Sequence, residues 1–147
     1  MEQAFQTAVR LLAQREHSTA ELRRKLLGKG CAQSQTDAVL QRLARDGLLS
    51  DPRFTESFIR SRVAHGFGPL HIQAQLRERG IDAALSTEFL DPQARHWREL
   101  AQTVRQKRFG QARPENYRER ARQMRFLQQR GFTMEQINAV FKLEDDD

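Results

Sequence analysis

The segment "IQAQLRERGI", residues 72–81, has apolar residues four positions apart and ends in a glycine followed by another apolar residue. The same arrangement occurs in "LRRKLLGKGC" (22–31) and, with glutamine in the first position, in "QMRFLQQRGF" (123–132). The glycines of the three segments are 50 and 51 residues apart: Gly30, Gly80 and Gly131. A recurrence of this length is typical of chains built from structural repeats. The sequence therefore predicts three repeats, each containing a helix that ends at one of these glycines.

The residues around each glycine support this interpretation. A basic residue precedes each one, as expected in a last helical turn, where cations are favoured: Lys29, Arg79 and Arg130. Soon after each glycine a residue that can cap the next helix follows: Ser34, Asp82 and Thr133. Two capping boxes, Ser18-Thr-Ala-Glu21 and Thr133-Met-Glu-Gln136, mark further helix starts. These three cations thus have a structural explanation before any functional one is needed.

Aspartate-proline pairs predict the first helix of the second and third repeats. Asp51-Pro52 and Asp91-Pro92 place a side-chain acceptor at the cap and proline at the first helical position. The Gly66-Phe-Gly68-Pro69 break is interpreted as the end of one helix and the start of the next. We therefore expect about nine helices in three repeats, at residues 2–50, 51–90 and 91–143, followed by an acidic tail at 144–147. No alternating β-branched run predicts a strand, so the expected fold class is all-α.

Composition narrows the function classes. The chain has 147 residues, which suits one small unit or a short repeat array. A single cysteine, Cys31, rules out an internal disulfide and a clustered zinc site, and its place in the repeat predicts a core position. The four histidines lack metal-ligand spacing, and no nucleophile-elbow or phosphate-binding glycine motif occurs. We expect no enzyme activity, no metal and no cofactor, and, without a signal peptide or a membrane span, a cytoplasmic protein.

The charge is unevenly distributed along the chain. The net charge is +6, with 25 basic and 19 acidic residues. Four of the acidic residues lie at 144–147, so residues 1–143 carry 25 basic against 15 acidic residues, or +10. A basic body suggests a polyanionic partner, either nucleic acid or an acidic protein groove. The alternative is a solvated surface with a solubilising tail.

Helical phase separates the predicted core from the predicted surface. Trp97 shares its stripe with apolar residues and is expected in the core. Between Pro114 and Arg130 the predicted buried face consists of Tyr117, Ala121, Met124 and Leu127. Another face carries a basic ridge, Arg118, Arg122 and Arg125, at positions i, i+4 and i+7. Arg24, Lys25 and Arg60 are also expected to point outward. Binding of an anion and simple solvation remain equal alternatives for the ridge.

Four segments in order resemble the RecX family of bacterial regulatory proteins. They are "ELRRKLLGKG" (21–30), "VLQRLARDGLLSDPRFTESFIRSR" (39–62), "GFGPLHIQAQLRERGI" (66–81) and "RFLQQRGFTMEQINAVF" (125–141). The resemblance covers about residues 4–142, and its middle part is the most specific. Two features depart from the pattern: Gln123, where the other repeats have Leu22 and Ile72, and the acidic tail.

The resemblance implies three tandem three-helix repeats in an elongated, curved body. It also implies a negative regulator of the RecA recombinase, which binds the RecA filament on single-stranded DNA and restrains its ATPase, strand-exchange and coprotease activities. The family offers no catalytic constellation. From phase and charge we expect six residues to meet acidic filament surface or phosphate: Arg24, Lys25, Arg60, Arg118, Arg122 and Arg125. We expect a monomer and no membrane partner.

Two other function classes stay open. One is a non-specific basic DNA-binding protein that contacts the backbone phosphates of single- or double-stranded DNA. The helices beginning near Ser34, Asp82 and Thr133 have an acid near their start and no Arg or Lys there, which disfavours reading of bases. The other is a helical scaffold for an unrelated protein.

Overall fold

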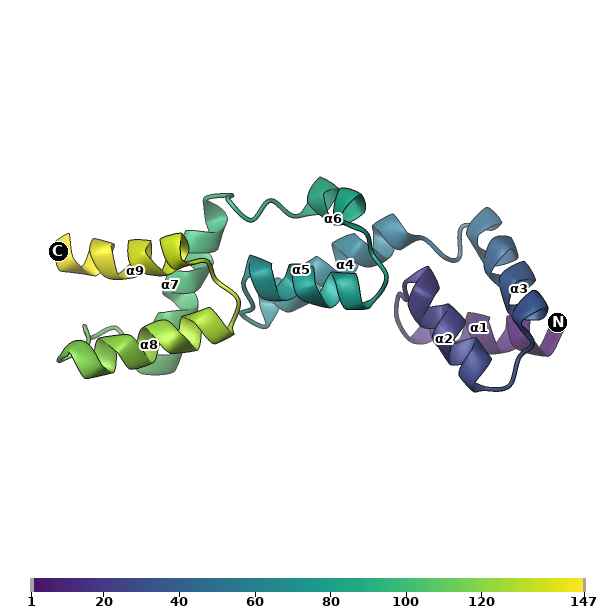
Figure 1. Cartoon of the computed structure of the whole chain (residues 1–147), viewed down its shortest axis with the longest axis horizontal. Helices are drawn as coiled ribbons and strands as arrows, with labels where there is room; N and C mark the ends of the chain where they lie inside the picture. The colour runs from purple at the N-terminus through teal and green to yellow at the C-terminus, as the bar shows by residue number, and fades with distance from the viewer. Residues whose placement is uncertain (1, 147) are drawn as a thin grey trace. The chain divides into compact units, whose positions relative to one another are not determined.

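The structure is a computed structural model that describes residues 2–146, with side chains described through Lys142. The described residues form helices and no strand, as the sequence predicted (Figure 1). In chain order the helices are α1 (Glu2–Gln14), α2 (Thr19–Gly28), α3 (Gln33–Arg45), α4 (Asp51–Ala64), α5 (Pro69–Glu78), α6 (Ala83–Phe89), α7 (His96–Phe109), α8 (Tyr117–Gln129) and α9 (Met134–Asp146). The expected nine helices are therefore confirmed. The acidic residues of the predicted tail, 144–147, lie outside the described side chains.

The helices belong to two compact units. One contains α1 to α3, α4 up to Phe58, and Leu76–Phe89; the other contains α4 from Ile59, α5 up to Gln75, and the chain from Leu90 onward. In the first unit α1, α2 and α3 pack on one another, and in the second α7, α8 and α9 do the same (Figure 1). The first and third repeats are thus three-helix bundles within separate units.

The three glycine helix ends are as predicted. Gly30, Gly80 and Gly131 have φ values of 91°, 79° and 99°. The residue after each glycine donates its backbone N–H to a carbonyl five residues earlier, at 3.0–3.2 Å: Cys31 to Leu26, Ile81 to Leu76, and Phe132 to Leu127. This bond closes the helix and returns the chain toward the core. The repeated sequence pattern therefore encodes a repeated helix end.

Several predicted helix starts are confirmed. Ser18 and Glu21 form the capping box of α2. Thr133 and Gln136 exchange the same pair of hydrogen bonds, at 2.9 and 3.1 Å, before α9. Asp82 accepts the Leu85 N–H at 2.8 Å before α6. The break before Pro69 also separates two helices, since α4 ends at Ala64 and α5 begins at Pro69.

Two predicted starts are wrong, those at Ser34 and Asp91, whereas α4 begins at Asp51 as predicted but has a different cap. Helix α3 begins at Gln33 after an uncapped Ala32, not at Ser34, and Asp37 lies beyond its first turn, where it pairs with Arg23. Ser50 caps α4 by accepting the Arg53 N–H at 3.2 Å, which leaves Asp51 to accept the Thr19 N–H at the start of α2.

Asp91 does not start a helix, and α7 begins five residues later at His96. The Asp91 carboxylate accepts the Gln93 N–H at 2.9 Å, and its carbonyl accepts the Trp97 indole N–H at 2.7 Å. These bonds hold residues 91–95 in a turn against the first turn of α7. An aspartate-proline pair therefore marks a chain reversal here and not a helix cap.

The core of the first repeat is apolar. Its buried residues are Ala4, Ala8, Leu22, Leu26, Val39, Leu40, Leu43 and Leu49. Cys31 is half-buried and packs against them, in agreement with its predicted core position. Burying one leucine stabilises a fold by about 2 kcal/mol, so this cluster accounts for the packing of α1 to α3.

The core of the third repeat mixes apolar and polar side chains. Trp97 is 1% exposed, as predicted, and lies with buried Ala101, Leu127, Phe132, Ile137, Val140 and Phe141. Arg105 and Gln123 are also buried, and the Arg105 Nη1 donates to Gln123 Oε1 at 3.0 Å. Hydrogen bonding of this kind is what allows polar groups to remain in a core. The doubtful position in the repeat pattern, Gln123, therefore has a polar partner that the pattern did not reveal.

Tyr117, predicted to be buried, is 91% exposed. The buried residues of α8 are Gln123 and Leu127. Tyr117 lies about 100° around the helix from the centre of that stripe, at 100° per residue. The prediction failed because it left Gln123 out of the buried face and so displaced that face around the helix.

The second helix of one repeat contacts the glycine end of the second helix of the next. In the first unit, Ser18 at the start of α2 donates its hydroxyl to the Arg79 carbonyl at 2.6 Å. In the second unit, the Gly68 N–H at the start of α5 donates to the Arg130 carbonyl at 2.7 Å. Ser18 and Gly68 are 50 residues apart, and Arg79 and Arg130 are 51 apart. The contact between adjacent repeats is therefore repeated as well.

Candidate partner-binding surface

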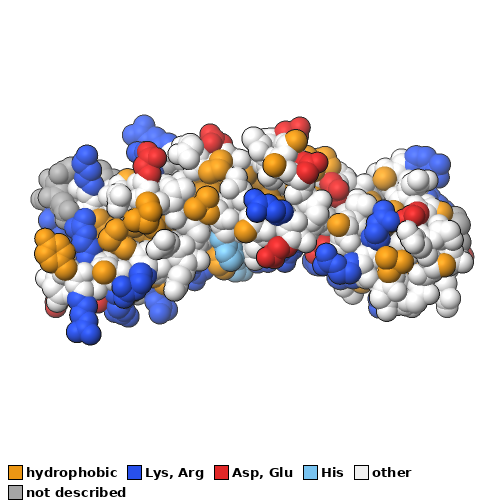
Figure 2. All heavy atoms as spheres, viewed as in Figure 1, with side chains coloured by type: hydrophobic (Ala, Val, Ile, Leu, Met, Phe, Trp, Pro, Cys, Tyr) orange, Lys and Arg blue, Asp and Glu red, His pale blue; other side chains and the backbone are white. Residues whose placement is uncertain are grey.

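The predicted basic ridge is exposed on α8. Arg118, Arg122 and Arg125 are all solvent-exposed, and Figure 2 shows Lys and Arg side chains gathered along the edge of the molecule where α8 lies. Asn116 fixes the start of this helix by accepting the Glu119 N–H at 2.9 Å. The ridge is thus carried by a helix with a defined start and a buried opposite face.

An acidic residue, which the sequence interpretation did not include, modifies the ridge. Arg122 Nη1 lies 3.2 Å from Glu119 Oε1 and also faces the Phe109 ring, with its guanidinium carbon 5.4 Å from the ring centre. The Glu119 pKa is lowered, and the largest cause is the hydrogen bond from the Gln123 amide. Slight burial opposes this change, whereas the hydrogen bond and the charge of Arg122 lower the pKa further. Glu119 therefore stays ionised at neutral pH and offsets one ridge cation. Arg118 and Arg125 carry the rest of the ridge charge.

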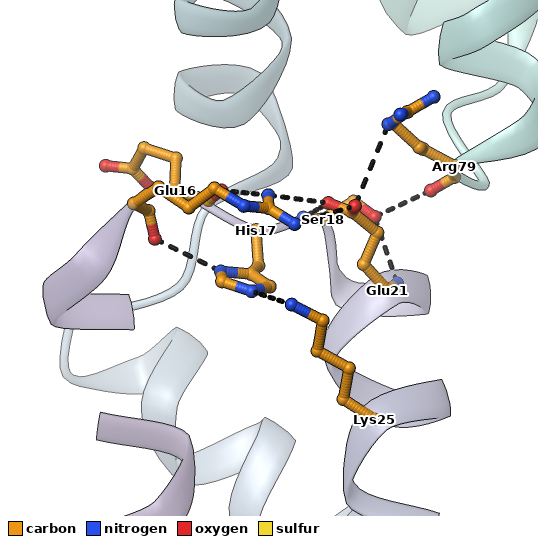
Figure 3. A network of polar contacts seen from close by, with 7 residues as sticks. Glu16, His17, Ser18, Glu21, Lys25 and Arg79 are labelled. Atoms are coloured by element: carbon orange, nitrogen blue, oxygen red, sulfur yellow. Dashed lines mark hydrogen bonds and ion pairs between the residues drawn. The ribbon is translucent and has the colours of Figure 1, made fainter. Parts of the chain in front are cut away.

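The other predicted contact residues are exposed but lie on separate elements. Arg24 and Lys25 are on α2 in the first unit, and Arg60 is on α4 in the second. The Lys25 Nζ lies 2.9 Å from the Nε2 of His17 (Figure 3). The contact with His17 therefore restrains the Lys25 side chain. Among the side chains that the structure describes, Arg118 and Arg125 have no comparable contact.

His17 is buried, with 1% of its surface exposed, and contacts two partners (Figure 3). A lysine ammonium can only donate, so the Nε2 of His17 accepts from Lys25, and the Nδ1–H donates to the Arg15 carbonyl at 3.1 Å. Burial lowers the His17 pKa; the hydrogen bond to the Arg15 carbonyl opposes this, and the charges of Arg15 and Lys25 add to the lowering. His17 is therefore neutral at pH 7 and has a structural role.

A further network joins the first and second repeats within the first unit. Glu21 receives hydrogen bonds from Arg15 at 3.3 and 3.4 Å and from the Ser18 N–H, and Arg79 lies 3.7 Å from it (Figure 3). Burial alone would raise the Glu21 pKa, but the bonds from Arg15 and Ser18 outweigh it, so the pKa is lowered. Arg79, expected only to stabilise the end of its helix, thus also contributes to this junction.

A cluster of arginines and phenylalanines in the second unit was not predicted. Phe109 and Phe126 meet edge to face, with ring centres 5.4 Å apart. The guanidinium carbons of Arg108 and Arg130 each lie 5.3 Å from the centre of the Phe126 ring. Phe126 and Arg130 are four residues apart on one helix, which is the spacing that could have indicated the contact.

The sequence matches models of all three RecX domains. Residues 4–43 match the first three-helix domain, 50–90 the second and 98–141 the third. The chain belongs to the RecX family. A "Regulatory protein RecX" from Halorhodospira halophila is 44% identical over 140 residues, which is 95% of this chain and 87% of the relative. One from Pseudomonas putida is 42% identical over 139 residues, 95% of this chain and 89% of the relative. The family is thus one of regulatory proteins.

Two solved structures have the same fold. The crystal structure of RecX from Lactobacillus salivarius has a TM-score of 0.83 at 19% identity and covers 99% of this chain and 97% of its own. A second crystal structure, of regulatory protein RecX, has a TM-score of 0.79 at 19% identity, over 99% of this chain and 73% of its own. At this identity the likeness concerns the fold, and it confirms the predicted three-helix repeats.

Within residues 2–146, no helix combines the length and apolarity that crossing a bilayer requires. Among the side chains that the structure describes, those of residues 2–142, His, Cys, Asp and Glu do not come together in groups of three or more that could hold a metal ion.

Proposed function

We propose that this protein is a negative regulator of the RecA recombinase. It binds the RecA filament on single-stranded DNA and restrains the ATPase, strand-exchange and coprotease activities of the filament, acting as a monomer in the cytoplasm. The observation that carries this proposal is the match to all three RecX domains along the chain. The exposed cations support a polyanionic or acidic partner.

Within this proposal, six exposed cations contact acidic filament surface or phosphate. They are Arg24, Lys25, Arg60, Arg118, Arg122 and Arg125. Arg118 and Arg125 contribute most, since Glu119 offsets the charge of Arg122 and His17 holds Lys25. A surface of this kind changes association rates and salt dependence more than it changes folding.

The test is the steady-state ATPase of the cognate RecA protein on single-stranded DNA, titrated with this protein at near-physiological salt. A parallel titration measures binding to the DNA alone. Inhibition at concentrations well below those that coat bare DNA is the expected result. Inhibition that appears only when the DNA is saturated would instead support the second candidate, a basic DNA-binding protein that competes for the strand.

The same assay tests the ridge. Reversing Arg118, Arg122 and Arg125 together to Glu should weaken inhibition about tenfold or more, because it replaces attraction by like-charge repulsion. A control variant with Lys29→Glu and Arg45→Glu, two exposed cations of the first repeat, should change inhibition little. Unchanged inhibition by a folded triple variant would show that the ridge is not part of the binding surface.

A further inference from the structure

Two hollows of about 490 and 560 Å³ lie beside α9, but a smaller one in the same unit has the more distinctive lining. The smaller hollow has a volume of about 420 Å³ and lies between the end of α4, the face of α7 and the end of α8. Its lining residues are Val63, Ala64, His65, Gly66, Leu100, Thr103, Val104, Lys107, Arg108, Phe126 and Arg130. We call it the α4–α7–α8 hollow.

Apolar groups line much of this hollow. Val63, Leu100 and Val104 are half-buried lining residues. Gly66 fits closely against Val104, since a Cβ added there would lie 3.2 Å from the valine Cγ2. The end of α4 is therefore packed on α7, so the hollow is part of the folded unit. Its size suits one apolar side chain of a partner.

The rim of the hollow is cationic. Lys107 and Arg108 come from the last turn of α7, and Arg130 follows α8, where it donates to the His65 carbonyl at 3.1 Å. Cations are common in last helical turns, but here they come from two helices and face one hollow. The lining contains no Asp or Glu. The segments that carry the lining residues, 63–66, 100–108 and 126–130, also contain no acidic residue.

The aromatic rings near the rim already have partners. The Phe126 ring faces the guanidinium groups of Arg108 and Arg130 and meets the edge of Phe109. Phe67 stacks on His71, with centres 4.5 Å apart, and also faces Arg130. Single-stranded nucleic acid is held by bases stacked on open aromatic faces. An apolar hollow with a cationic rim, whose phenylalanine ring already faces two arginines, fits a protein segment better than a base.

We propose that the α4–α7–α8 hollow is a docking site for an acidic segment of a partner protein. An apolar side chain of that segment enters the hollow beside Val104, and Asp or Glu residues next to it pair with Lys107, Arg108 and Arg130. This inference rests on the proposed function, in which the partner is the protein component of the filament. It adds a specific site, distinct from the α8 ridge, and a specific partner chemistry.

Two substitutions test the apolar and the ionic parts separately. Ala64→Trp fills the hollow from an exposed position at the end of α4 without changing the charge, and Lys107→Glu reverses an exposed rim charge. The matched controls are Ala13→Trp and Lys29→Glu, both at exposed positions of the first repeat. Circular dichroism and thermal unfolding establish that each variant is folded, and Lys107→Gln provides a milder change at the same position.

The measurement is the anisotropy of the fluorescently labelled protein, titrated with RecA filament on oligo(dT) and, separately, with oligo(dT) alone. We expect Ala64→Trp and Lys107→Glu each to weaken filament binding about tenfold or more, as central interface changes do, with the controls within about twofold. Ala64→Trp should leave binding to oligo(dT) unchanged.

The outcomes separate the two proposals. If the unmodified protein binds filament and both hollow variants bind it equally well, the docking site is wrong and the proposed function stands. If Lys107→Glu weakens filament and oligo(dT) binding alike while Ala64→Trp changes neither, the rim is a phosphate contact and the docking site is again wrong. If the unmodified protein does not bind filament, the proposed function fails and the docking site fails with it.

Discussion

The first and third repeats place different chemistry at the same position of the same three-helix plan. Leu22 of α2 is fully buried among aliphatic side chains. Its counterpart in α8, Gln123, is 3% exposed and is bonded to the fully buried Arg105. Arg105 also donates to the Ala112 carbonyl at 3.4 Å, in the segment that joins α7 to α8.

This difference shows that the repeat pattern determines which positions are buried. Whether the buried residue is polar depends on the side chains around it. The glutamine is stable at that position because Arg105 of the preceding helix donates to its Oε1 and its own amide donates to Glu119. Aromatic rings complete the site, since the Arg105 and Arg120 guanidinium carbons lie 5.9 and 5.1 Å from the centre of the Phe141 ring. Four predictions test this comparison, and in the first two Trp97, the single tryptophan, reports on the third repeat.

The largest effect is expected from Leu22→Gln. The change removes a buried aliphatic group and buries an amide without the arginine that Gln123 has, which should cost about 4 kcal/mol. Urea unfolding followed by circular dichroism should show the loss, while the Trp97 fluorescence transition should move much less. A cost under about 1 kcal/mol would mean that the first repeat tolerates polarity as the third does.

Arg105→Ala should cost about 3 kcal/mol in the Trp97 transition, because it leaves a cavity and removes the partner of a buried amide. Replacing the pair together, Arg105→Met with Gln123→Leu, should recover most of that loss, because well-packed apolar residues often replace buried polar groups without cost. If the double variant is as unstable as the sum of the two single variants, Arg105 and Gln123 are not coupled.

These positions show which features of the fold could be predicted from the sequence and which could not. The glycine ends and the capping boxes were predictable because they depend on residues close in the chain, as in residues 18–21 and 123–132. The Arg105–Gln123 pair was not, because its partners are 18 residues apart on different helices and helical phase alone cannot join them. Exposure of the ridge was predicted correctly, but the offset of one of its three charges by Glu119 was not considered.

Gly30 and Gly131 provide a matched pair for the repeated helix end. Both have positive φ, so alanine is strained at each by about 1 kcal/mol. At Gly131 a Cβ would also lie 2.4 Å from the His71 Cβ, whereas at Gly30 it would meet nothing within 4 Å. Gly131→Ala should therefore cost about 1–3 kcal/mol more than Gly30→Ala, as overpacking does. Equal costs would show that the contact between repeats is not tight.

The smallest effect is a pH dependence in the first repeat. Because burial lowers the His17 pKa, the unfolded chain binds the proton more readily, and stability should fall as pH drops below about 6.5, the unfolded value. His17→Asn keeps a donor for the Arg15 carbonyl and should reduce the slope of unfolding free energy between pH 7.5 and 5.5. The change should be below about 1.4 kcal/mol per pH unit, the limit for one proton. The lowered Glu21 pKa affects stability only below about pH 4.5, so it does not contribute to the slope between pH 7.5 and 5.5. An unchanged slope would show that protonation of His17 does not cause the loss of stability at low pH.

The most direct test of the account is hydrogen–deuterium exchange of the protein alone, with RecA filament on oligo(dT), and with oligo(dT) at the same concentration. We predict slower exchange with filament in peptides from residues 58–68 and 100–130, which carry the hollow and the ridge, and little change with oligo(dT) alone. Equal protection by bare oligo(dT) would contradict protein contact as the basis of function. Protection confined to residues 4–43 would show that neither the hollow nor the ridge takes part in that contact.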